Sequence, residues 1–127
     1  MSSRGYTLDA GALIGVDRGD RRMAFLIGRA FERQAVLTIP ATALAQVVRS
    51  PGRQVQLMRL VRHRRVSIVP LDGEASLKVG RMLAQSGTAD IADAHVVVCA
   101  QQAQQPVITS DPADLRRLDP ALPLFVL

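Results

Sequence analysis

Cysteine and long apolar runs are almost missing from this chain of 127 residues. Its single cysteine, Cys99, excludes an internal disulfide framework and is typical of a protein kept in a reducing compartment. No apolar run reaches the roughly 18 residues that a membrane-spanning helix needs. The N-terminal segment MSSRGYTLDAG lacks the apolar stretch of a secretory signal peptide. These absences predict a cytoplasmic protein with no membrane partner.

Lysine and aromatic residues are also scarce. Lys78 is the only lysine, so arginine supplies nearly all of the positive charge, and the formal net charge is +5. Arginine binds phosphate through paired donors, so this charge favours a polyanion such as nucleic acid as the partner. The alternative is an arginine-rich surface that binds nothing. Aromatic residues make up only 3% of the chain, which disfavours a platform that stacks bases.

Short apolar runs alternate with longer stretches of helical periodicity. We expect strands at 6–8, 36–39, 66–69, 107–109 and 124–126. We expect helices at 10–16, from Asp20 onward, at 42–49, from Ser50–Pro51 onward, at 72–85, at 88–102 with Thr88 as the cap, and from Asp111–Pro112 onward. This alternation predicts an α/β fold with a parallel central sheet of about four to five strands flanked by helices. The length and the hydrophobic content of 48% suit a single domain over residues 1–127.

Four aspartates are placed where such a fold binds ligands. Asp9 follows the first expected strand and Asp111 follows the fourth, so both lie at the carboxyl edge of the sheet. Asp90 and Asp93 have the i, i+3 spacing of one helix face, and their helix leads into the fourth strand. Each also has an ordinary structural interpretation. Asp9 and Asp111 can cap helices, and Asp90 falls in a first turn where the helix dipole favours a negative charge.

Asp93 is the hardest of the four to explain as a helix-start residue. We expect it past the first turn, directly before the apolar sequence AHVVV. A carboxylate at the entrance to a buried helix is costly unless it is paired or bound to a metal ion. With lysine nearly absent and no cysteine–histidine cluster, the carboxylates favour a hard cation, Mg²⁺ or Mn²⁺. Such a site can activate water and stabilise a phosphate during phosphodiester hydrolysis.

Four stretches of the sequence resemble the PIN-domain family, in particular the VapC-type ribonuclease toxins of bacterial toxin–antitoxin pairs. They are YTLDAGALIG at 6–15, TIPATALAQVVR at 38–49, DIADAHVVVCA at 90–100 and VITSDPADL at 107–115. The resemblance implies a PIN-like three-layer sandwich and a Mg²⁺- or Mn²⁺-dependent endoribonuclease that hydrolyses RNA. It also implies a cognate antitoxin protein as a partner, and a homodimer.

The family's acidic positions match particular residues of this chain. The resemblance assigns the catalytic, metal-binding acids to Asp9, Asp93 and Asp111. Asp114 is a second acid close to the last of these. Ser110 matches a small polar position that often helps to hold the site.

Gln46 departs from the family pattern, which usually has a glutamate at this position. A glutamine oxygen can touch a cation but brings no charge, so Asp90 is the candidate that joins the metal ligands and supplies the missing charge. Two interpretations therefore stay open: a ribonuclease, and a catalytically weakened PIN-fold module that binds RNA or a protein partner. The basic stretch that includes Arg49 and Arg53 is expected to contact RNA phosphates or to form solvated helix faces.

Two further interpretations concern a different metal and a different fold. His95 and Cys99 have a spacing that can bind metal, but no second pair completes a zinc site, so we interpret both as core residues. A phosphate-accepting receiver domain would share the sheet and the acidic pocket. It is disfavoured because Lys78 falls within an expected helix rather than after a late strand.

Overall fold

The computed structural model describes residues 5–127. Residues 1–4, which begin both the N-terminal segment and the domain expected over 1–127, lie outside the described residues. Its elements are β1 (Tyr6–Leu8), α1 (Ala10–Asp17), α2 (Arg21–Glu32), β2 (Leu37–Pro40), α3 (Ala41–Val47), the 3₁₀ turn η1 (Pro51–Arg53), α4 (Val55–Val61), β3 (Val66–Val69), α5 (Gly73–Ser86), α6 (Ile91–Ala103), β4 (Val107–Thr109), α7 (Pro112–Leu118) and β5 (Leu124–Val126). All five expected strands are confirmed, and only β2 is displaced, by one residue.

The helix expected to restart at Pro51 is interrupted. A single 3₁₀ turn forms there, and α4 begins only at Val55. The buried side chain of Gln54 explains the break, because its Oε1 accepts hydrogen bonds from the backbone N–H groups of Arg49 and Ser50 at 2.9 and 3.1 Å. Its Nε2 donates to the carbonyl of Val47 at 3.0 Å. One side chain thus fixes the loop that follows α3.

The five strands form one parallel sheet in the order β3-β2-β1-β4-β5. The chain winds from β1 towards β3, then crosses to β4 and continues outward to β5. The direction of winding therefore reverses between β1 and β4. In open α/β sheets this switch point, beyond the carboxyl ends of the strands, is the usual ligand site.

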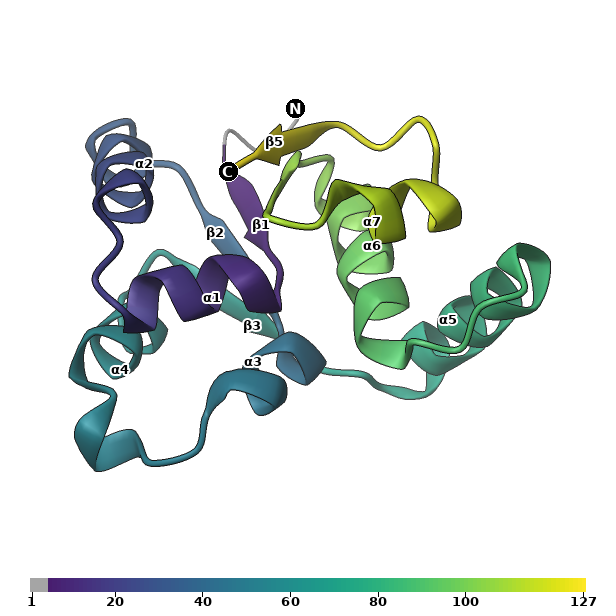
Figure 1. The fold of residues 1–127 in the computed structure, drawn as a ribbon, viewed down its shortest axis with the longest axis horizontal. Coiled ribbons are helices and arrows are strands. Elements are labelled where there is room, and N and C mark those ends of the chain that lie inside the picture. Colours follow the sequence, from purple (N-terminus) through teal and green to yellow (C-terminus); the bar gives the residue numbers. More distant parts are fainter. Residues whose placement is uncertain (1–4) are drawn as a thin grey trace.

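The helices cover both faces of the sheet, so the architecture is a three-layer α/β fold (Figure 1). Helices α1, α2 and α4 lie together on one side, and α5, α6 and α7 lie together on the other. Helix α3 packs against both α1 and α6. This position brings α3 to the carboxyl edge of the sheet, beside the N-terminal ends of α1 and α6.

Helix α6 is the central helix of its layer. Its run from Ala94 to Ala100 is buried, and it packs against β1, β2 and β4. The histidine and cysteine in this run, His95 and Cys99, are 0% and 2% exposed, which confirms both as core residues. Such a helix cannot shift without disturbing the core, so the residues at its N-terminus are held firmly against the sheet. No helix within residues 5–127 is both long and apolar enough to cross a membrane.

Candidate active site

Asp9 lies directly after β1 and is the N-cap residue of α1. Its side chain is buried, and Oδ1 accepts a hydrogen bond from the backbone N–H of Ala12 at 2.8 Å. Burial raises the pKa of Asp9 and the charge of Asp111 adds to the rise, while hydrogen bonds from Thr109 and Ala12 oppose it. The expected cap is therefore confirmed. It leaves a buried carboxylate that forms no ion pair with any residue in 5–127.

Asp90, rather than Thr88, caps α6, so the expected helix start at Thr88 is wrong. Oδ1 of Asp90 accepts a hydrogen bond from the backbone N–H of Asp93 at 2.9 Å, and the helix begins at Ile91. Thr88 belongs to the end of α5: its hydroxyl pairs with that of Ser86 at 2.8 Å, after Gly87 has ended the helix with a positive φ of 68°. The chain needs these residues to turn before α6 can start.

Asp93 consequently lies in the first turn of α6, not beyond it as we expected. The helix dipole therefore favours its charge. Even so, the pKa of Asp93 is raised to about 6, first by burial and then by the charges of other carboxylates. In order of effect these belong to Asp90, Asp114, Asp9 and Asp111. The structure thus brings all five acids into one electrostatic neighbourhood at the switch point.

Asp111 and Asp114 lie at the start of α7 and are exposed. The side chain of Asp111 makes no capping hydrogen bond, so its interpretation as an ordinary cap is not supported. Its backbone N–H donates to Oγ1 of Thr109 at 2.9 Å, which fixes the turn after β4. A side-chain hydrogen bond with Asp114 raises the pKa of Asp111, and the charge of Asp114 adds to the rise.

Ser110 reaches the same site through a close approach to α1. A Cβ built on Gly11 would lie 2.4 Å from Oγ of Ser110 and 3.4 Å from Oδ1 of Asp9. Only a glycine at position 11 allows the serine hydroxyl to occupy this place. The supporting position expected for Ser110 is therefore beside the carboxylate of Asp9.

The residues expected on the α3 side are more dispersed. Gln46 is exposed on α3, and no hydrogen bond joins it to an acid within the described chain. Nη1 of Arg49 donates to the carbonyls of Ala45 and Val48 at 3.0 and 2.7 Å. Arg53 is exposed in η1. These contacts tie Arg49 to the end of α3.

Thr42 and His95 form a contact that the sequence did not indicate. Oγ1 of Thr42 on α3 and Nδ1 of His95 on α6 share a hydrogen bond of 2.7 Å. Burial lowers the pKa of His95, although the backbone of Pro70 and the charge of Asp72 oppose this, and Nε2 has no partner in hydrogen-bonding geometry within residues 5–127. This buried histidine joins α3 to the helix that carries Asp93.

The acids fit a divalent cation by donor type and by charge balance. Ion pairs in residues 5–127 are limited to Arg29–Glu32 and Lys78–Glu74, and neither involves an acid of this cluster. Carboxylate oxygens are the donors that Mg²⁺ and Mn²⁺ prefer, and a cation would relieve the repulsion that raises the pKa of Asp93. Within the described chain, however, no three acidic, histidine or cysteine side chains already surround one point closely enough for an ion. The carboxylates therefore lie near one another but do not yet form a closed coordination shell around one point.

Arg117 is a neighbour of the acids that sequence reasoning missed. A hollow of about 140 Å³ beside the start of α6 is lined by Thr88, Ala89, Asp90, Asp93, Asp114, Arg117 and Leu118. The charge of Arg117 lowers the pKa of Asp111. The i, i+3 spacing from Asp114 on a short helix is the signal that could have found it.

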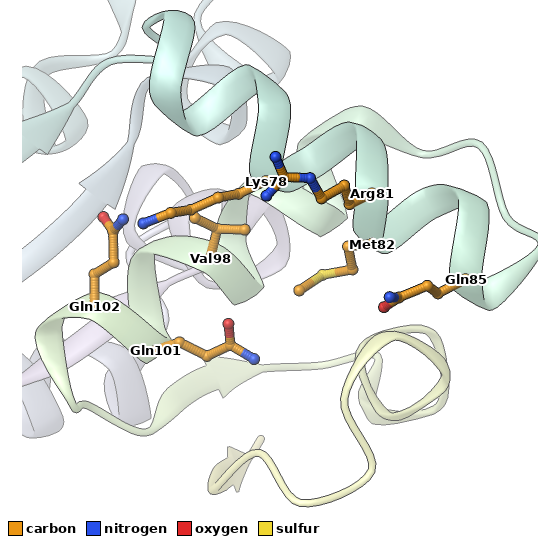
Figure 2. A pocket seen from close by; sticks show the side chains of 7 residues that line it. All are labelled: Lys78, Arg81, Met82, Gln85, Val98, Gln101 and Gln102. Carbon is orange, nitrogen blue, oxygen red and sulfur yellow. The ribbon is translucent and has the colours of Figure 1, made fainter.

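A larger hollow of about 420 Å³ lies between α5 and α6 (Figure 2), and none of the five acids lines it. It is lined by Lys78, Arg81, Met82, Gln85, Val98, Gln101 and Gln102. No carboxylate lines it, so it lacks the donors of a hard-cation site. The candidate chemistry therefore stays at the switch point.

Comparisons with known proteins agree with this architecture. The chain resembles VapBC2 from Rickettsia felis bound to a promoter DNA fragment, with a TM-score of 0.72 and 14% identity over 96% of this chain and 98% of that one. It also resembles FitAB bound to an IR36 DNA fragment, with a TM-score of 0.61 and 15% identity over 95% of this chain and 94% of that one. A third similar structure is FitAcB from Neisseria gonorrhoeae, with a TM-score of 0.59 and 17% identity over 94% of this chain and 96% of that one. At these identities the likeness concerns the fold. A search of the curated proteins found no match. The family model of the PIN domain matches residues 6–120, a span that includes all five acids. The chain belongs to the PIN domain family.

Proposed function

We propose that this protein is a Mg²⁺- or Mn²⁺-dependent endoribonuclease and the toxin of a toxin–antitoxin pair. The observation that carries the proposal is the convergence of five carboxylates at the switch point, where Asp93 has a pKa raised to about 6 without a compensating ion pair among residues 5–127. An arrangement that costs free energy in the absence of a cation supports cation binding as its purpose. The likeness to the solved complexes of VapBC2 and FitAB with DNA supports an antitoxin as the partner.

Asp9, Asp93 and Asp111 would hold the metal ion, with Asp90 adding charge. A bound Mg²⁺ or Mn²⁺ supplies an activated water and neutralises charge on the scissile phosphate. Asp9 is fixed by its cap and its burial, and Asp93 by the central helix, so these two provide the rigid side of the site. Asp111 and Asp114 are exposed and can adjust to the ion, with Ser110 supporting the carboxylate of Asp9.

Antitoxin binding, a homodimer and action in the cytoplasm belong to the same proposal. VapBC2 and FitAB, two structures that this fold resembles, are each bound to a DNA fragment. Arg49 and Arg53 remain proposed contacts for RNA phosphates outside the acidic pocket, and Arg49 has guanidinium donors left beyond Nη1 for this role.

Cleavage of a labelled structured RNA tests the proposal. We expect wild type to cleave it in Mg²⁺ or Mn²⁺ but not in EDTA, and Asp93→Asn to lose at least 100-fold in rate, because that variant keeps the shape and removes the charge. Glu74→Gln is the matched control, since it removes one exposed carboxylate on α5 that does not line the acidic hollow. Equal rates in wild type and Asp93→Asn would reject the assignment.

A second candidate is a PIN-fold module with weakened catalysis, and Gln46 favours it. α3 carries no acid, so its side of the pocket contributes no charge. Gln46→Glu separates the two candidates. If wild type fails to cleave RNA and Gln46→Glu cleaves it, the weakened module is correct, whereas similar cleavage by both proteins supports the enzyme.

A further inference from the structure

Arg117 is placed differently from the other arginines within residues 5–127. It lies in the last turn of α7 and lines the hollow that Asp90, Asp93 and Asp114 also line. It is therefore a cation at the rim of the anionic site.

The contacts of Arg117 do not explain this position. Within residues 5–127 its guanidinium forms no ion pair with the acids that line the same hollow and donates no side-chain hydrogen bond. Arg49 differs, because its guanidinium is used by two backbone carbonyls. A favourable interaction with the end of the α7 dipole applies equally to Arg116, which lies in the same last turn but does not line the hollow.

The hollow and the guanidinium suit one phosphate group. A volume of about 140 Å³ is well below the roughly 300–1,000 Å³ of sites that enclose a drug-sized ligand. The carboxylates that surround it repel a polyanion, so an approaching strand needs a nearby cation. A planar guanidinium with paired donors binds phosphate oxygens in a defined orientation.

We propose that Arg117 binds a backbone phosphate of the RNA strand next to the scissile one and so positions that strand over the acids at the switch point. This inference rests on the proposed nuclease function and adds a substrate-binding residue to it. Its readout is RNA affinity, which does not depend on turnover.

The test measures how tightly a fluorescent single-stranded RNA binds to the Asp93→Asn protein in Mg²⁺. The same measurement is made on two double variants, which carry Arg117→Ala or Arg116→Ala in addition to Asp93→Asn. Fluorescence anisotropy at several salt concentrations gives Kd for each protein. We expect Arg117→Ala to raise Kd about tenfold, the loss of one charged hydrogen-bonded contact, and to reduce the salt slope by about 0.7. Arg116→Ala removes the same charge one residue away, and we expect it to change Kd less than twofold. Arg117→Lys should recover only part of the affinity, because lysine lacks the paired donors.

Three results would overturn the inference: equal losses in the two alanine variants, full recovery with Arg117→Lys, or no RNA binding by the Asp93→Asn protein. Failure of the nuclease proposal gives a different result. In that case Arg117→Ala still weakens RNA binding selectively, but Asp93→Asn cleaves RNA as wild type does or neither protein cleaves it.

Discussion

The carboxylate of Asp90 accepts a hydrogen bond from the backbone N–H of Asp93, at 2.9 Å, and this contact starts α6. The first of two neighbouring acids thus holds the backbone of the second. Asp90 is exposed, whereas Asp93 is partly buried and its pKa is raised to about 6. Asp90 both caps α6 and adds charge beside Asp93, and substitutions at Asp90 can separate these two effects.

Asp90→Asn and Asp90→Ala should differ in stability but agree in metal binding. Asparagine is as good an N-cap as aspartate, whereas alanine loses about 1 kcal/mol. Both variants remove a charge beside Asp93, so both should weaken Mn²⁺ binding several-fold. Urea unfolding and calorimetric titration measure the two effects. If Asp90→Asn binds Mn²⁺ as wild type does, Asp90 is only a helix cap.

The raised pKa of Asp93 predicts how stability depends on pH. Its carboxyl holds a proton more tightly in the folded state, with a pKa of about 6, than in the unfolded state near 3.8. In EDTA the folded protein should therefore lose stability as pH rises from about 4 to 6, and then show no further loss from this group. Asp93→Asn removes that cost and should be more stable than wild type at pH 7.5 by about 1 kcal/mol, a figure reduced for solvent screening.

Urea midpoints in EDTA at pH 4 and pH 7.5 check this expectation. The advantage of Asp93→Asn should shrink at pH 4, where the wild-type carboxyl is protonated. A variant that is less stable than wild type at pH 7.5 would show that the charge of Asp93 is already compensated.

The hydrogen bond between Thr42 and His95 should stabilise the packing of α3 against α6. Thr42→Val keeps the shape but leaves Nδ1 of a fully buried ring without its partner, which costs about 1–3 kcal/mol. Thr42→Ser retains the hydroxyl and is the matched control. Urea unfolding that gives the same midpoint for Thr42→Val and Thr42→Ser would count against this contact.

Gly11→Ala should displace the hydroxyl of Ser110 from its place beside Asp9, because the new Cβ would lie 2.4 Å from Oγ. We expect several-fold weaker Mn²⁺ binding and a small change in unfolding free energy, since Ser110 is exposed and can turn away. If this is the mechanism, Ser110→Ala causes a similar loss and the double variant loses little more than either single one. If the losses of Mn²⁺ affinity in the two single variants add in full in the double variant, Gly11→Ala acts through Asp9 rather than through Ser110.

The sequence predicted the sheet, its five strands and the convergence of the acids. Short apolar runs mark where each strand ends, and the winding rules of parallel sheets bring those ends to one edge. It misplaced the start of α6, since Thr88 and Asp90 are both good caps and the choice between them depends on how α5 ends at Gly87. It also missed the Thr42–His95 contact, between residues 53 positions apart, and the place of Arg117. Such contacts arise from the packing of helices against one another, which hydrophobic periodicity does not specify.

The most direct test of the central claim, that the acids at the switch point jointly bind a divalent cation, is calorimetric titration with Mn²⁺ of wild type, Asp9→Asn and Glu74→Gln. Asparagine can keep the cap of α1, so Asp9→Asn changes the charge with little effect on the fold. We predict saturable binding in wild type and Glu74→Gln, and its loss in Asp9→Asn. Equal binding by Asp9→Asn and wild type, or no binding by wild type, would contradict the account.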